Sequence, residues 1–168
     1  MVDDSVEKLY LLPNHSSLLP ASTRAIVVLK IYMLLVEEMP NIDTAHANLA
    51  STILAAAAKP YMTPGNHWYD ICQNDTMLSN WLNYRGERMY TGDERSLMLL
   101  HRHVTHYSLE HQGKSPTSSC TYEAIQNLLE HTFPDFISRL QFLLWDNNIL
   151  KPLRLHTLFT ASPHPYDG

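Results

Sequence analysis

Four polar side chains near the middle of the chain have types and a spacing that suit hydrogen bonding to a nucleic acid. They are Thr76, Ser79, Asn80 and Asn83. An asparagine amide can pair with two atoms on the edge of an adenine, and serine or threonine hydroxyls can bond to bases or phosphates. The cationic side chains of Arg85 and Arg88 follow closely and can bind phosphate. Together these residues form a candidate nucleic-acid-binding surface.

A helix is needed to bring these residues onto one face, and the surrounding sequence predicts one. We expect a short helix over residues 68–73, a turn at Asn74-Asp75, and a second helix from Thr76 to about Tyr84. The apolar side chains of the second helix are expected to face inward: Met77, Leu78, Trp81 and Leu82. This pattern resembles the helix-turn-helix of phage-repressor-type regulators, whose recognition helix often carries a small polar residue, a Trp and a basic tail. The alternative is an ordinary amphipathic helix with a solvated polar face.

The segment Ser96–His156 has the order of elements of a second known family. It predicts a long helix, a turn containing Gly113, two shorter helices and an extended tail that includes Leu153–Leu155. This order resembles a winged helix-turn-helix. The resemblance implies that the helix expected over Pro134–Asn147 enters the major groove of DNA.

Some residues of this predicted recognition helix suit binding to DNA, and others favour a protein partner. Its polar side chains are Asp135, Ser138, Arg139 and Gln141. The resemblance implies contacts from Arg139, with Lys151 and Arg154 touching phosphates from the wing. Asp135 and Asp146 would repel phosphate. Winged helices also serve as protein-docking modules, so the architecture alone does not choose between the two partners.

Histidines on the long helix are the remaining residues that suggest chemistry. His103, His106 and Glu110 share one face, and imidazoles with a carboxylate can bind zinc. The chain lacks H-E-x-x-H and a paired-cysteine motif, which favours a polar helix face that titrates near neutral pH. It also lacks the nucleophile-elbow, Walker and dinucleotide-binding motifs. We therefore expect no enzyme activity, no metal and no cofactor.

Composition sets the fold class and limits the partners. The chain has 168 residues, of which 45% are hydrophobic and only five are glycine. These values predict a mainly α-helical domain of about six to seven helices with a winged-helix-like C-terminal half. The formal net charge of −5 disfavours indiscriminate binding of polyanions, although a local basic patch can still bind DNA.

Helix signals divide the chain into three segments. In the first, residues 1–60, one helix is expected from a Ser22 or Thr23 N-cap to Glu38, because Pro40 prevents its continuation. Its apolar residues favour a central core helix over a homodimer interface. A second helix is expected from Asp43 or Thr44 to about Ala58. Residues 61–92 hold the helix-turn-helix-like segment and 93–160 the winged-helix-like segment, with a linker at 59–66.

The remaining composition indicates a soluble, cytoplasmic protein without a membrane partner. Cys72 and Cys120 are far apart and indicate no disulfide framework, and Cys72 is expected in the core. The acidic N-terminus does not resemble a signal peptide. The longest apolar run, Ala25–Val36, is interrupted by Lys30 and is too short to span a membrane.

Two hypotheses follow from the sequence. The leading one is a sequence-specific DNA-binding transcriptional regulator, dimeric through its apolar first helix, with the side chains named above contacting DNA. The alternative is a protein-interaction module or inhibitor, in which a winged-helix-like scaffold occupies a basic surface of a partner protein. The net charge and the acidic residues near the helix over 134–147 favour this alternative.

Overall fold

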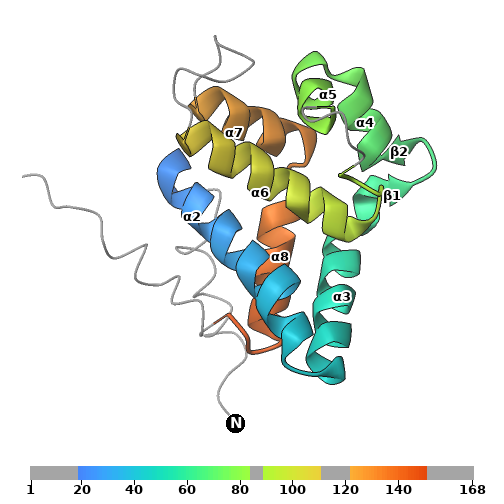
Figure 1. Cartoon of the computed structure of the whole chain (residues 1–168), viewed down its shortest axis with the longest axis vertical. Helices are drawn as coiled ribbons and strands as arrows, with labels where there is room; N and C mark the ends of the chain where they lie inside the picture. The colour runs from blue at the N-terminus through green and yellow to red at the C-terminus, as the bar shows by residue number, and fades with distance from the viewer. Residues whose placement is uncertain (1–18, 84–88, 111–121, 151–168) are drawn as a thin grey trace, which may run out of the picture.

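The computed structural model describes residues 19–83, 89–110 and 122–150, and this part of the chain is mainly helical (Figure 1). Seven α-helices occur among these residues. They are α2 (Ala21–Tyr32), α3 (Thr44–Ala58), α4 (Trp68–Asn74), α5 (Thr76–Leu82), α6 (Glu94–Glu110), α7 (Tyr122–Thr132) and α8 (Phe136–Asp146). The predicted mainly helical fold class is confirmed.

Shorter elements join the first helices. A π-helical turn, Met33–Glu38, and a 3-10 turn, Met39–Asn41, continue α2 towards α3. A second 3-10 turn, Lys59–Tyr61, follows α3. It leads into the antiparallel pair β1 (Met62–Thr63) and β2 (Asn66–His67), in which Met62 pairs with His67.

The helical backbone after α2 continues through Pro40, which the sequence analysis expected to end the helix. Pro40 has no N–H to donate to the carbonyl of Val36, four residues earlier. The guanidinium of Arg95 on α6 donates to that carbonyl instead, with Nη2 3.2 Å from the oxygen. Regular α-helix ends at Tyr32, earlier than predicted; a π turn then reaches Glu38, and a 3-10 turn carries the chain past Pro40.

The predicted N-cap of this helix is wrong. The helix begins at Ala21, and the position before it is occupied by Pro20. The Pro20 carbonyl accepts hydrogen bonds from the N–H groups of Thr23 and Arg24, each at 2.9 Å. Proline supplies no side-chain acceptor, so backbone geometry alone starts α2.

Aspartates precede three other helices and cap their first turns. They are Asp43 before α3, Asp75 before α5 and Asp93 before α6. In each case the carboxylate accepts a backbone N–H from the first helical turn at 2.7 to 2.9 Å. These hydrogen bonds satisfy donors that would otherwise be orphaned, which is why the starts of α3 and α5 could be read from the sequence.

Helix α6 packs against α2, α3, α5 and α7 and lies across the molecule in Figure 1. Its apolar face is fully buried through Leu97, Met98, Leu100 and Val104. Most apolar side chains of α2 are buried as well, including Val27, Val28, Ile31 and Tyr32. The interpretation of the first helix as a core helix is therefore supported, and its packing partner is α6 of the same chain.

The segment predicted as a linker, 59–66, is anchored to the helices through Tyr61, although residues 63–66 are exposed. Tyr61 is buried, and its ring meets that of Phe133 edge-on at a centroid distance of 5.3 Å. Its hydroxyl accepts the backbone N–H of Asp135 at 3.3 Å, just before α8. This contact accompanies a helix start at Phe136 rather than at the predicted Pro134, which lies in the preceding turn.

Candidate functional site

The predicted polar face of α5 exists. Thr76, Asn80 and Asn83 are exposed and Ser79 is half-buried, whereas Leu78, Trp81 and Leu82 of the same helix are buried. Met77 packs against the core while half-buried. The division follows the 3.6-residue period of the helix, which places residues three and four apart on one side.

Two of these polar side chains use their donors within α5. The Ser79 hydroxyl donates to the Thr76 carbonyl at 3.1 Å. The Asn83 amide donates to the Ser79 carbonyl at 2.8 Å. The first bond lies in the opening turn of a helix of only seven residues, and the second adds a side-chain donor to a carbonyl near its end, so both side chains stabilise the helix.

The charge around α5 is negative within the described part of the chain. Residues 68–83 contain Asp70 and Asp75 and no lysine or arginine. Arg85 and Arg88, which the sequence hypothesis uses to bind phosphate, lie outside the described residues. Phosphate contacts dominate the affinity of most DNA-binding proteins. The described part of α4 and α5 therefore offers hydrogen bonding without the cations that DNA binding also needs.

Helix α8 differs from the predicted recognition helix at one important position. Gln141, expected on the polar face, is 1% exposed and lies on the buried side of the helix with Leu140 and Leu144. Arg139 is exposed as predicted. Lys151, Arg154 and the predicted wing strand lie outside the described residues. The helix therefore presents fewer polar groups for reading bases than its sequence indicates.

The outward side of α8 carries a stripe of exposed residues that we call the α8 stripe. It consists of Asp135, Arg139, Phe142 and Asp146, spaced by four, three and four residues. Phe142 is 46% exposed, and its ring centroid lies 5.9 Å from that of the half-buried Trp145. The stripe thus combines an aromatic pair with two carboxylates and one guanidinium.

Sequence reasoning missed Phe142 because aromatic residues are usually assigned to the core. A signal was present: Ile137, Leu140 and Leu144 already form a complete apolar face at spacings of three and four. Phe142 does not belong to that series. A large aromatic residue outside the core series of an amphipathic helix is a candidate contact residue.

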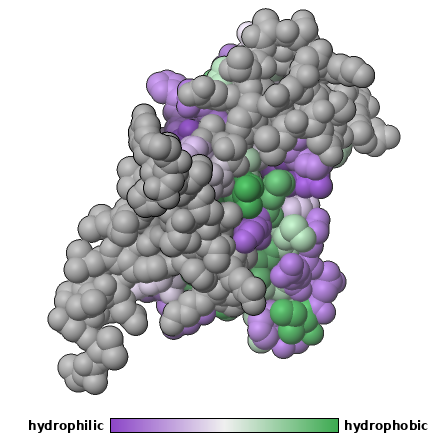
Figure 2. All heavy atoms as spheres, turned by 90° about the vertical axis from the view of Figure 1, so that its left-hand side faces the viewer, coloured by the Kyte–Doolittle hydropathy of each residue, from purple (hydrophilic) through white to green (hydrophobic). Residues whose placement is uncertain are grey.

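The side of the molecule on which α2 lies in Figure 1 carries isolated apolar residues. Ile26 is 41% exposed and Met33 is 49% exposed, seven residues apart. Figure 2 shows this side, where hydrophobic residues alternate with hydrophilic ones over the described part of the surface. Apolar side chains scattered singly are normal at protein surfaces.

The histidines of α6 have separate environments. His103 is buried, and its Nδ1 lies 3.0 Å from the hydroxyl of Tyr90. His101 is also buried, its Nε2 has no hydrogen-bond partner, and burial lowers the pKa of its ring to about 3. The side chain of Glu110 lies outside the described set. Among the side chains that the structure describes, no three His, Cys, Asp or Glu groups are placed to hold a metal ion.

Cys72 is fully buried, as predicted, and is inert as a nucleophile. Burial, together with the nearby carboxylate of Asp75, raises the pKa of its thiol to about 12. The reactive form of cysteine is the thiolate, which is scarce at neutral pH when the pKa is this high. Cys72 is therefore a core residue.

No protein-family model, curated protein or solved structure matches the chain. The described helices include none that is both long enough and apolar enough to cross a membrane.

Proposed function

We propose that this protein is a protein-interaction module that docks a partner on the α8 stripe. The observation that carries the proposal is the exposed ring of Phe142, paired with Trp145 at 5.9 Å on a helix whose opposite side is fully buried. Aromatic residues are enriched among the few residues that supply most of the binding energy at interfaces. A rigid helix also holds such an anchor in place before binding, which lowers the entropic cost.

The chemistry of the stripe suggests the chemistry of the partner. Asp135 and Asp146 stand at its two ends, and Arg139 supplies its single positive charge. The net charge of the chain is −5. An apolar surface rimmed by lysine or arginine side chains complements this arrangement, because rim charges of opposite sign speed association and exclude wrong partners.

A defined peptide pair tests the proposal. One synthetic amphipathic helix carries leucines on one face and lysines on the other, and its matched counterpart carries glutamates in place of lysines. We expect the lysine peptide to bind the full chain and the glutamate peptide to bind much more weakly. Phe142→Ala should weaken binding of the lysine peptide about tenfold or more, while Asn80→Ala on α5 should leave it unchanged. Equal binding of both peptides, or an unaffected Phe142→Ala variant, contradicts the proposal.

DNA binding through α5 is the second candidate function. The exposed side chains of Thr76, Asn80 and Asn83 favour it, because they lie on one side of the helix and include two amides suited to adenine. In this hypothesis Arg85 and Arg88 bind phosphate, and Arg139, Lys151 and Arg154 add contacts from the C-terminal segment. The regulator would be a homodimer on a two-fold operator.

Fluorescence anisotropy with a labelled random-sequence duplex separates the two functions. Binding that is strong at low salt and fades at physiological salt supports the DNA hypothesis, because released counterions drive such binding. Replacing Arg85 and Arg88 by alanine should then weaken it by about 1 kcal/mol each. Absence of binding at low salt removes the DNA hypothesis and leaves the protein partner.

A further inference from the structure

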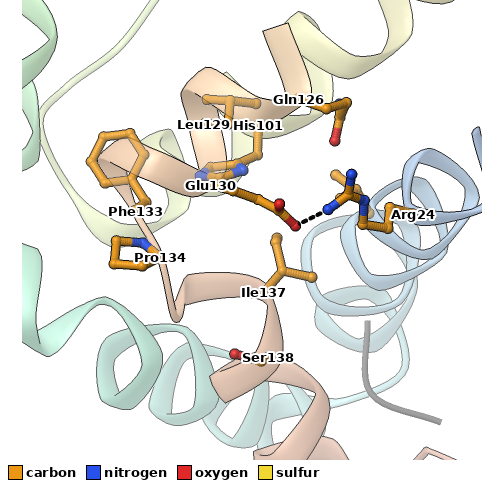
Figure 3. A pocket seen from close by; sticks show the side chains of 10 residues that line it. Arg24, His101, Gln126, Leu129, Glu130, Phe133, Pro134, Ile137 and Ser138 are labelled. Atoms are coloured by element: carbon orange, nitrogen blue, oxygen red, sulfur yellow. Dashed lines mark ion pairs between the residues drawn. The ribbon is translucent and has the colours of Figure 1, made fainter. Parts of the chain in front are cut away.

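A small cavity lies between α2, α6, α7 and the start of α8 (Figure 3). Its volume is about 40 Å³, which is enough for a few non-hydrogen atoms. Arg24, His101, Gln126, Glu130 and Ser138 contribute polar groups, and the rest of the wall is apolar. The cavity is separate from both the α5 face and the α8 stripe.

Two buried nitrogen atoms of residues that line this cavity have no hydrogen-bond partner within the part of the chain that the structure describes. They are Nε of Arg24 and Nε2 of His101. His101 is 3% exposed, so water outside the protein does not satisfy its ring. A buried polar atom without a partner is destabilising and rare in folded proteins, so two in one cavity indicate that something bonds to them.

The other polar groups of the cavity are already engaged. The guanidinium of Arg24 forms an ion pair with the carboxylate of Glu130, which Figure 3 marks with a dashed line. The amide of Gln126 donates to the hydroxyl of Thr105 on α6 at 2.9 Å. These contacts leave the two nitrogen atoms without a partner among the residues that the structure describes.

The charges of the wall determine the charge of that occupant. The ion pair between Arg24 and Glu130 is balanced, and the buried His101 ring is uncharged at neutral pH. A carboxylate ligand would meet Glu130 at close range, and an ammonium ligand would meet Arg24. An uncharged molecule avoids both repulsions and loses less solvation on entry.

The hydrogen-bonding groups determine its functional group. The Nε–H of Arg24 can only donate, so the occupant must offer an oxygen acceptor. The Nε2 atom of a neutral His101 either donates or accepts, depending on the tautomer. A hydroxyl group can bond to both nitrogens in either tautomer of His101, because it both accepts and donates hydrogen bonds.

We propose that this cavity binds a small uncharged molecule with a hydroxyl group, either water or a short alcohol. The apolar part of an alcohol would lie against Leu129, Phe133 and Ile137, which line the cavity beside the polar atoms. The site does not depend on the proposed docking function of the α8 stripe.

Nuclear magnetic resonance on the full chain tests the proposal, with ethanol as the probe and acetate as a charged probe of similar size. We expect a nuclear Overhauser effect between water and the Arg24 Nε–H in the absence of ethanol. A saturable shift of this resonance on adding ethanol, with no saturable shift on adding acetate, identifies an alcohol site. The water signal with no ethanol response identifies water as the occupant.

Two variants on α6 test whether the response arises at the cavity. His101→Phe removes one of the two polar nitrogens and should abolish or strongly weaken the response. His103→Phe, two residues away on α6 and outside the cavity wall, should leave the response intact. The proposal is overturned if the wild-type protein shows neither the water signal nor an ethanol response, or if acetate binds as well as ethanol.

Discussion

Two regions beside α6, one at α4 and α5 and one at α7 and α8, differ in how their buried polar groups are satisfied. Beside α4 and α5, the Trp68 indole donates to the Gly92 carbonyl at 2.9 Å, and Tyr90 bonds to His103. Beside α7 and α8, His101 packs against the rings of Phe133 and Phe136 and leaves Nε2 unpartnered. The first region is therefore a satisfied core with a polar surface. The second has a polar cavity inside and an aromatic contact outside.

This difference in buried hydrogen bonding indicates which region is expected to bind a ligand or partner. Buried groups that are fully bonded stabilise a fold, whereas an unsatisfied buried group and an exposed aromatic ring both have a stability cost that a ligand or partner can offset. By this criterion the proposed docking surface and the proposed cavity site both fall in the α7–α8 region, and we expect the α4–α5 region mainly to support the fold.

The largest expected effect comes from the satisfied region. Trp68 is fully buried, with its ring edge-on to those of Tyr69 and Tyr90. Trp68→Ala should lower the free energy of unfolding by about 3–5 kcal/mol, measured by urea denaturation. Trp145→Ala removes a half-buried ring of the other region and is the matched control, with a smaller expected loss. A larger loss for Trp145 would reverse the comparison.

Lowering the pH should reduce the free energy of unfolding by a similar amount, because of the buried His101 ring beside the cavity. The folded pKa of His101 is about 3, against a usual value near 6.5 in the unfolded chain. Between these values the unfolded state binds more protons, so stability should fall as pH falls from about 6.5 towards 3 and be unaffected by this group at higher pH. The expected loss at pH 4 relative to pH 7 is about 3 kcal/mol.

Denaturation of His101→Phe over the same pH range checks the assignment. The variant lacks the titrating ring, so its stability should depend less steeply on pH than that of the wild type. His131→Phe, at an exposed position of α7, should keep the wild-type slope. A variant at position 101 with an unchanged slope would show that other groups cause the pH dependence.

The smallest effects are expected on the α5 face. Asn80→Ala should change the free energy of unfolding by less than about 0.5 kcal/mol, because the residue is exposed. Asn83→Ala should cost about 0.5–1 kcal/mol, because it removes the hydrogen bond to the Ser79 carbonyl. Thermal unfolding compares the two variants directly. If Asn80 proved the costlier position, the α5 face would contain contacts beyond those of a solvated helix.

Local signals in the sequence determined much of the helical framework. The starts of α3 near Asp43 and of α5 at Thr76 were predictable, because a cap bonds to N–H groups within the next turn, which the neighbouring sequence alone specifies. The period of apolar residues placed Leu140 and Leu144 in the core for the same local reason. The polar face of α5 was predictable on this basis as well.

Contacts between distant segments decided the rest. The passage of the chain beyond Pro40 depends on Arg95, and the packing of the expected linker depends on Tyr61 meeting Phe133. The burial of Gln141 and the cavity beside His101 likewise arise where separate helices meet. The sequence by itself determined which residues form helices and which side of each helix is apolar, because those are local properties. Only the tertiary structure decided which polar groups are buried, bonded or left for a ligand, because that depends on which helices pack together.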